Sequence, residues 1–108
     1  LITKGVSMTT LSVRRIARPK AYGTFQQGYV DVSYAKLVRT FGRPLKGDGY
    51  KTDAEWVLKI GPQIVTIYNY KTGKSYLGPK GLPVSKITRW NIGGKTGGVV
   101  HLVKLALK

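Results

Sequence analysis

Apolar residues recur at helical spacing in two parts of the chain. The first part has apolar side chains at i, i+3, i+4 and i+7: Tyr34, Leu37, Val38 and Phe41. This spacing places them on one face of an α-helix. Ser33 is suited to the N-cap, while Gly42 and Pro44 mark the end. The second part has a similar face: Val99, Leu102, Val103 and Ala106. It predicts a final helix that opens at Lys95 or Thr96.

Four other segments predict β-strands. Residues 28–33 and 54–60 alternate between apolar and polar positions, and residues 86–92 place Thr88, Trp90 and Ile92 on one face. Residues 64–70 are rich in β-branched and aromatic residues on both faces, which is typical of a central strand. The turn Gly61-Pro62-Gln63 joins residues 54–60 to residues 64–70 and predicts a hairpin.

The order strand, helix, three strands, helix predicts an α+β fold. We expect an antiparallel sheet of about four strands with two helices on one face. The segments 45–52 and 71–84 are rich in glycine, lysine and proline and predict irregular structure. Residues 1–22 are predicted to form a basic extended arm, and residues 23–108 a compact α+β domain. Residues 8–20 also resemble an organelle-targeting segment, being basic and free of acids.

The charge is strongly one-sided. The 108 residues carry a net charge of +15, and no acid occurs after Glu55, although nine basic residues follow it. Such a chain repels itself, so the excess charge favours a polyanionic partner. Apolar content is 42%, enough for a core, and no apolar run is long enough to cross a membrane.

The sequence offers few groups for catalysis or for binding metal. It has no cysteine, one histidine (His101) and four acids. No ligand cluster with metal spacing exists, so neither a metal nor a cofactor is predicted. Gly94-Lys95-Thr96 copies only the tail of a phosphate-binding P-loop, because Arg89 stands where the pattern needs a glycine. We expect no enzyme activity and assign no catalytic residue.

Basic and aromatic residues are interleaved in a way that suits nucleic acid. Lysine and arginine neutralise phosphates, and aromatic rings stack on unpaired bases. The predicted nucleic-acid-binding residues are Arg14, Arg15, Arg18, Lys20, Tyr70, Lys71, Lys74, Tyr76, Lys80, Lys86, Arg89 and Lys95. For Trp56 and Trp90, packing within the sheet is the favoured interpretation.

The stretch from Gly28 to about Leu105 resembles a small uncharacterised domain found in phages and large DNA viruses. The resemblance depends on residues 28–34, 47–56, 66–71 and 87–94. It implies an α+β fold and a viral source, and it carries over no functional residue. Family members are acidic or neutral, so the basic character of this chain suggests a viral domain adapted to lie against nucleic acid.

These observations predict a non-enzymatic, sequence-independent nucleic-acid-binding protein. It would act structurally, in genome packaging or as a component of a virion or nucleoprotein, beside other proteins of a large assembly. A ribosomal protein that binds rRNA, in an organelle for example, fits the same size and charge. A third hypothesis is a phage inhibitor of a host defence protein, which requires an acidic target surface. The sequence does not separate DNA from RNA.

Overall fold

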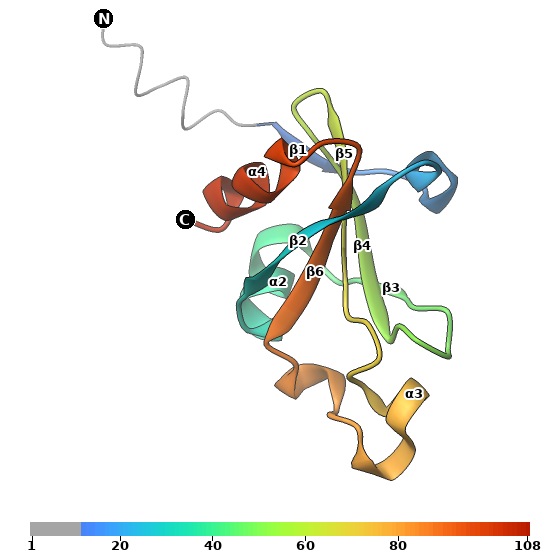
Figure 1. The fold of residues 1–108 in the computed structure, drawn as a ribbon. Helices are drawn as coiled ribbons and strands as arrows, with labels where there is room; N and C mark the ends of the chain where they lie inside the picture. Colours follow the sequence, from blue (N-terminus) through green and yellow to red (C-terminus); the bar gives the residue numbers. More distant parts are fainter. Residues whose placement is uncertain (1–11) are drawn as a thin grey trace, which may run out of the picture.

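A computed structural model describes residues 12–108 and shows an α+β fold built on one antiparallel sheet (Figure 1). The strands are β1 (Val13–Arg15), β2 (Phe25–Asp31), β3 (Leu45–Lys46), β4 (Ala54–Ile60), β5 (Gln63–Tyr68) and β6 (Arg89–Gly94). The strand order is β1-β4-β5-β6-β2, and β3 also pairs with β4. β1 pairs with the end of β4 and β3 with its start, so both short strands lie on the same edge of the sheet.

The helices are α2 (Tyr34–Phe41), α3 (Lys74–Leu77) and α4 (Gly98–Ala106). Three 3₁₀ turns accompany them: η1 (Arg18–Ala21), η2 (Gly78–Lys80) and η3 (Val84–Lys86). α2 and α4 cover one face of the sheet, whereas α3 and the turns beside it extend beyond one end (Figure 1). α4 lies close to the sheet because Gly94 has no side chain: a Cβ there would lie 2.6 Å from Val99 Cγ2.

The core lies between the sheet and these two helices. Trp56 and Trp90 are completely buried at its centre, with ring centroids 5.4 Å apart and nearly perpendicular planes. Tyr34 of α2 packs against both rings. The indole nitrogens donate to backbone carbonyls, Trp56 to Gly42 and Trp90 to Ile87. The packing interpretation of the tryptophans agrees with this arrangement.

The predicted α+β class and antiparallel sheet are confirmed, but the predicted element counts match only roughly. The sheet has six strands rather than about four, and there are three helices rather than two. β3 is too short to produce an alternating pattern. Residues 10–13 alternate like a short strand, but β1 comprises Val13–Arg15, whose two arginines had been interpreted as the end of that pattern. α3 has only four residues and lies in the segment that was predicted to be irregular.

The described part of the predicted arm lies against the sheet. The backbone amide of Ile16 donates to Val57 O, and that of Gly61 donates to Ser12 O. These bonds extend the pairing of β1 with β4. η1 then crosses to the sheet face opposite the helices, where Arg18 reaches Glu55. The rest of the predicted arm, residues 1–11, lies outside the described residues.

Candidate nucleic-acid interface

Three tyrosines and two lysines from separate segments form an exposed cluster, named here the Tyr–Lys cluster: Tyr50, Lys51, Tyr70, Lys71 and Tyr76. Tyr50 and Lys51 belong to the loop before β4, Tyr70 and Lys71 follow β5, and Tyr76 lies in α3. Tyr50, Tyr70 and Tyr76 are 57%, 43% and 39% exposed, respectively. They are therefore open to a flat ligand from solvent.

The lysines of the cluster lie against its rings. Lys71 Nζ lies 5.3 Å from the centroids of both Tyr70 and Tyr76, and Lys51 Nζ lies 5.4 Å from Tyr50 and 6.0 Å from Tyr70. The ring centroids of Tyr50 and Tyr76 are 5.4 Å apart. The four lysine–ring distances are within the range of cation–π attraction, and the Tyr50–Tyr76 distance is within that of aromatic pairs. The cluster thus combines stacking surfaces and positive charge in one small area.

The backbone fixes the two Tyr–Lys pairs relative to each other. The amide of Lys71 donates to the carbonyl of Lys51 over 2.7 Å. Lys71 adopts a φ of 60°, and it is the one non-glycine residue of 12–108 with a positive φ. A left-handed conformation costs a lysine about 1 kcal/mol or more, and such strain is often found at functional positions.

Asp48 shapes the loop that carries Tyr50 and Lys51. Its carboxylate oxygen Oδ1 accepts hydrogen bonds from the backbone amides of Tyr50, Lys51 and Thr52, at 2.8 to 3.0 Å. The amide bonds from Thr52 and Tyr50 hold the pKa of Asp48 below its usual value. The carboxylate is therefore occupied in ordering the loop.

Asn69 and Asp53 form the support beneath the cluster. Asn69 is completely buried, and its Oδ1 accepts from the amides of Asp53 and Ala54 at 2.7 and 3.1 Å. Its Nδ2 donates to Asp53 Oδ2 at 2.8 Å. Asp53 Oδ1 accepts from the amide of Ser75, which holds α3 in place. Burial acts to raise the pKa of Asp53, but the hydrogen bonds from Ser75 and Asn69 outweigh it and lower the pKa.

The sheet face opposite α2 and α4 continues this surface. Cross-strand pairing aligns one row of side chains across four strands: Glu55, Tyr68, Asn91 and Tyr29. A groove of about 440 Å³ runs beside this row, with Tyr68, Gly93 and Phe25 among its lining residues and Tyr70 linking it to the Tyr–Lys cluster. Burial raises the pKa of Tyr68.

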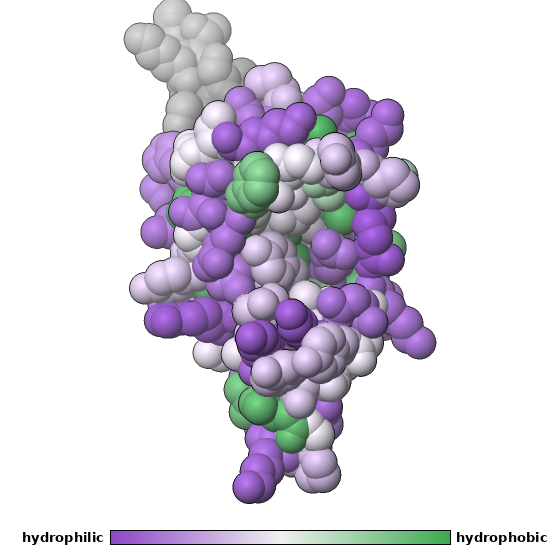
Figure 2. All heavy atoms as spheres, turned by 45° about the vertical axis from the view of Figure 1, so that its right-hand side comes forward, coloured by the Kyte–Doolittle hydropathy of each residue, from purple (hydrophilic) through white to green (hydrophobic). Residues whose placement is uncertain are grey.

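Arg89 lies at one end of this face and contacts an aromatic ring. Its guanidinium carbon is 4.1 Å from the ring centroid of Tyr29, and its Nε donates to Asp31 at 3.2 Å. Both members of this ion pair are about 60% exposed. Figure 2 brings the right-hand side of Figure 1 forward and shows that hydrophilic residues cover most of this face.

All four carboxylates of the chain have partners within residues 12–108. Arg89 pairs with Asp31 and Arg18 with Glu55, while Asp48 and Asp53 accept the bonds described above. These are the two ion pairs seen in the described residues, against nineteen lysines and arginines in the chain. The positive charge is therefore largely uncompensated, and each acid has a structural role.

All twelve residues predicted to bind nucleic acid are exposed, but they do not form one patch. Tyr70, Lys71 and Tyr76 meet in the Tyr–Lys cluster. Lys74 lies in α3, Lys80 in η2 and Lys86 in η3. The remaining predicted residues lie elsewhere: Arg14 and Arg15 in β1, Arg18 and Lys20 in η1, Arg89 in β6, and Lys95 after β6. Arg15 points to the helix side, where its Nη1 donates to Phe41 O.

The sequence prediction missed Tyr50 and Lys51. A signal for them exists, because Tyr50-Lys51-Thr52 and Tyr70-Lys71-Thr72 are the same tripeptide. The two copies lie side by side, joined by the hydrogen bond between the amide of Lys71 and the carbonyl of Lys51. A search for repeated short aromatic–basic motifs would have identified both copies.

The part of the chain that the structure describes contains no group of three or more histidine, cysteine or acidic residues able to hold a metal ion. Its longest helix, α4, has nine residues. No helix of residues 12–108 has the length and apolar character needed to cross a membrane. No protein-family model and no curated protein matches the sequence. The resemblance to a domain of phages and large DNA viruses therefore stays a prediction.

Proposed function

We propose that this protein is a non-enzymatic nucleic-acid-binding protein that contacts phosphates and unpaired bases without reading sequence. The observation that carries the proposal is the Tyr–Lys cluster, in which three exposed rings and two ammonium groups form one surface. Stacking on aromatic rings combined with neutralisation of phosphates is the usual chemistry of binding to single strands.

The charge distribution supports this proposal. A net charge of +15, with two of the four acids in ion pairs and the other two accepting hydrogen bonds, favours association with a polyanion. Within residues 12–108, neither α2 nor α4 carries an asparagine or glutamine side chain of the kind that reads adenine in the major groove. The proposed contacts are therefore mainly with the backbone and with the faces of bases.

The proposal is tested by fluorescence anisotropy with labelled single-stranded DNA, duplex DNA and structured RNA across a salt series. Counterion release predicts that the logarithm of the binding constant falls linearly with the logarithm of salt concentration. A steep fall on all three ligands is the expected result. No binding at low salt would overturn the proposal and would leave an acidic protein as the partner.

A matched pair of variants tests the cluster itself. Lys51→Ala with Lys71→Ala removes two charges from the cluster, and Arg39→Ala with Arg43→Ala removes two exposed charges from α2 and the segment after it. Net charge falls equally in both proteins. Greater loss of single-strand affinity in the first variant supports the cluster as a binding surface. Equal losses would mean that binding depends on net charge alone.

The same titrations separate two biological roles. Similar affinity for all three ligands supports a packaging or virion component that binds any nucleic acid. Strong preference for structured RNA supports a ribosomal protein, and the exposed rings of Tyr50, Tyr70 and Tyr76 favour this second candidate because unpaired bases in RNA loops are available for stacking.

A further inference from the structure

β2 ends the sheet, and its outer edge is unpaired within residues 12–108. The amide of Val32 donates inward to Thr88 O, and Val30 lies opposite Trp90 in β6. Because backbone groups alternate along a strand, the amides and carbonyls of Tyr29 and Asp31 point outward. An unpaired edge of this kind is a template for pairing with another strand.

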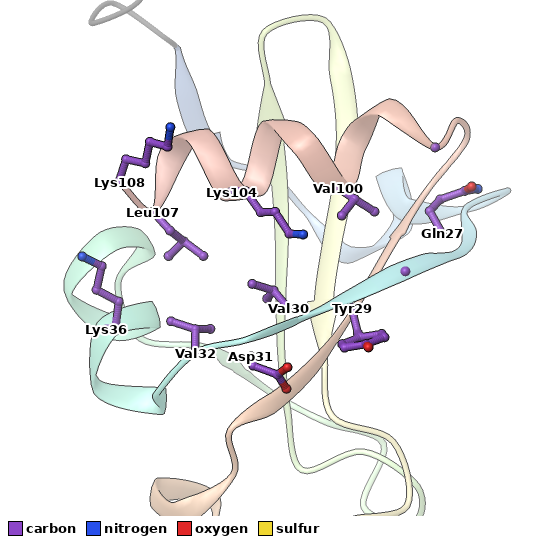
Figure 3. A pocket seen from close by; sticks show the side chains of 12 residues that line it. Gln27, Tyr29, Val30, Asp31, Val32, Lys36, Val100, Lys104, Leu107 and Lys108 are labelled. Atoms are coloured by element: carbon purple, nitrogen blue, oxygen red, sulfur yellow. The ribbon is translucent and has the colours of Figure 1, made fainter.

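A groove of about 820 Å³ runs along this edge between β2, α2 and α4 (Figure 3). Val30 and Val32 point from β2 toward α4, and Leu107 points back toward them. With Val100 they give the groove an apolar floor. Gly28 brings α4 close to the strand, since a Cβ there would lie 3.0 Å from Val100 Cγ2.

Three lysines surround the apolar floor: Lys36 from α2, and Lys104 and Lys108 from α4. Figure 3 shows Lys104 reaching into the space between α4 and β2. The one acid of the groove is Asp31, and Arg89 already pairs with it. The groove therefore offers an apolar centre, a cationic rim and an unpaired strand edge together.

We propose that this groove binds an extended, acidic segment of a partner protein, which adds to β2 as a further strand. Backbone bonds to Tyr29 and Asp31 would supply affinity, as in other complexes formed by strand addition. Side chains at every second position of the segment would point toward the helices, where apolar ones would lie on Val32 and Val100. Acidic side chains at the other helix-facing positions of the segment would face Lys36, Lys104 and Lys108.

The apolar floor favours a peptide over nucleic acid at this position. A nucleic acid backbone places charge and sugar against a surface, whereas Val32 and Val100 present partly exposed apolar side chains in the groove. A second copy of this chain is disfavoured, because two proteins of charge +15 repel each other. This surface is separate from the Tyr–Lys cluster and does not depend on nucleic-acid binding.

The test uses the full chain and a short labelled peptide in which valine and glutamate alternate at every second position, with serine between them, so that both types face the helices. It is compared with a polyglutamate peptide of equal length. We expect the alternating peptide to bind more tightly, and we expect Lys104→Glu with Lys108→Glu to weaken its binding roughly tenfold. The control is Lys80→Glu with Lys86→Glu, which changes net charge equally at η2 and η3.

Amide hydrogen exchange identifies the binding mode. Strand addition should slow exchange at Tyr29 and Asp31, whose amides point outward, and should leave Val30 nearly unchanged. Failure of the alternating peptide to bind, or binding without this protection, would overturn the proposal. Protection of these amides by single-stranded DNA instead of the peptide would also overturn it, and would assign the three lysines to nucleic acid.

Discussion

The amide of Lys71 donates to the carbonyl of Lys51 over 2.7 Å, so two copies of the same tripeptide lie next to each other. The bond joins the loop before β4 to the segment after β5. It brings Tyr50 and Tyr70 onto one surface, to which α3 adds Tyr76. The arrangement is held from below by hydrogen bonds, so the rings are positioned before any ligand arrives.

The rings of the Tyr–Lys cluster should matter more for single strands than for duplexes. We expect Tyr50→Ala or Tyr76→Ala to weaken single-stranded DNA binding by about 1–3 kcal/mol, the usual contribution of stacking on one base. Duplex binding should change much less, because paired bases are not available to the rings. Tyr22→Ala is the control, since Tyr22 is 91% exposed and outside the cluster. Equal effects on both ligands would contradict stacking.

Two substitutions at Lys71 separate backbone strain from charge. Both Lys71→Gly and Lys71→Ala remove the ammonium group, and we expect equal losses of nucleic-acid affinity. Only glycine relaxes the left-handed backbone with its φ of 60°. The glycine variant should therefore be more stable than the alanine variant by about 1 kcal/mol in urea unfolding. Equal stabilities would show that the conformation is not strained.

Asn69 should be important for stability. Asn69→Ala removes the acceptor for two amides, those of Asp53 and Ala54, at a buried position. We expect a loss of about 2–4 kcal/mol, because buried donors would lose their partners. Thermal unfolding should shift downward by roughly 10–20 °C.

Asn91→Ala serves as the control for this substitution. Asn91 accepts a hydrogen bond from Gln26 Nε2 at 3.4 Å on the exposed sheet face. Its loss should change stability by no more than about 0.5 kcal/mol. If the two variants had the same midpoint of unfolding, the network beneath the cluster would not stabilise the fold.

Asp53 should make the fold sensitive to acid. Its pKa in the folded protein is lowered from the ordinary value of 3.8, because bonds from Ser75 and Asn69 outweigh the opposing effect of burial. Ionised Asp53 therefore stabilises the fold above the unfolded pKa, and this contribution disappears as pH falls through the folded pKa. Urea midpoints measured from neutral pH to below the ordinary value should fall, and Asp53→Asn should flatten that fall. An unchanged slope in the variant would contradict the assignment.

Arg89 should contribute to binding but little to stability. Its ion pair with Asp31 is about 60% exposed, and exposed pairs contribute less than about 1 kcal/mol. Arg89→Gln should reduce the slope of the logarithm of the binding constant against the logarithm of salt concentration by about one, the effect of losing one phosphate contact. Arg89→Lys should keep that dependence, yet weaken single-strand binding, because lysine lacks the planar group that lies over Tyr29. A large change in unfolding midpoint in either variant would contradict this role.

Elements with strong local signals could be predicted from sequence. α2 is the best example: Ser33 Oγ accepts from the Lys36 amide as an N-cap should, and the chain leaves the helix at Gly42 with a φ of 86°. The final helix also has the predicted apolar face, with Val99 and Val103 buried. In both cases a local pattern and the packing of the core agree.

Strand ends depended on contacts that a pattern does not contain. β5 was predicted to reach Tyr70, but it ends at Tyr68 because the buried Asn69 side chain bonds to the backbone of another segment. β6 was predicted to end before Gly93, yet it continues to Gly94, because the glycines allow α4 and Thr66 to approach closely.

For the candidate interface, the exposure of the residues could be predicted from the sequence, but their grouping could not. Ten of the twelve residues are lysine or arginine, whose charge predicts exposure, and all twelve are exposed. Their grouping depends on loops that meet only after folding, which is why Tyr50 and Lys51 were missed. The bounds of β1 were likewise not predicted, because a strand of three residues depends on pairing with β4 more than on its own composition.

Because Trp56 and Trp90 are buried, their fluorescence is a signal separate from that of the exposed tyrosines. Both indoles are shielded from solvent, whereas the tyrosines of the cluster are exposed. Selective excitation of tryptophan should therefore report whether the core is intact, and tyrosine emission should respond when a base covers the rings. Folding and ligand contact can thus be followed in one unlabelled sample, so a variant that fails to bind is readily distinguished from one that fails to fold.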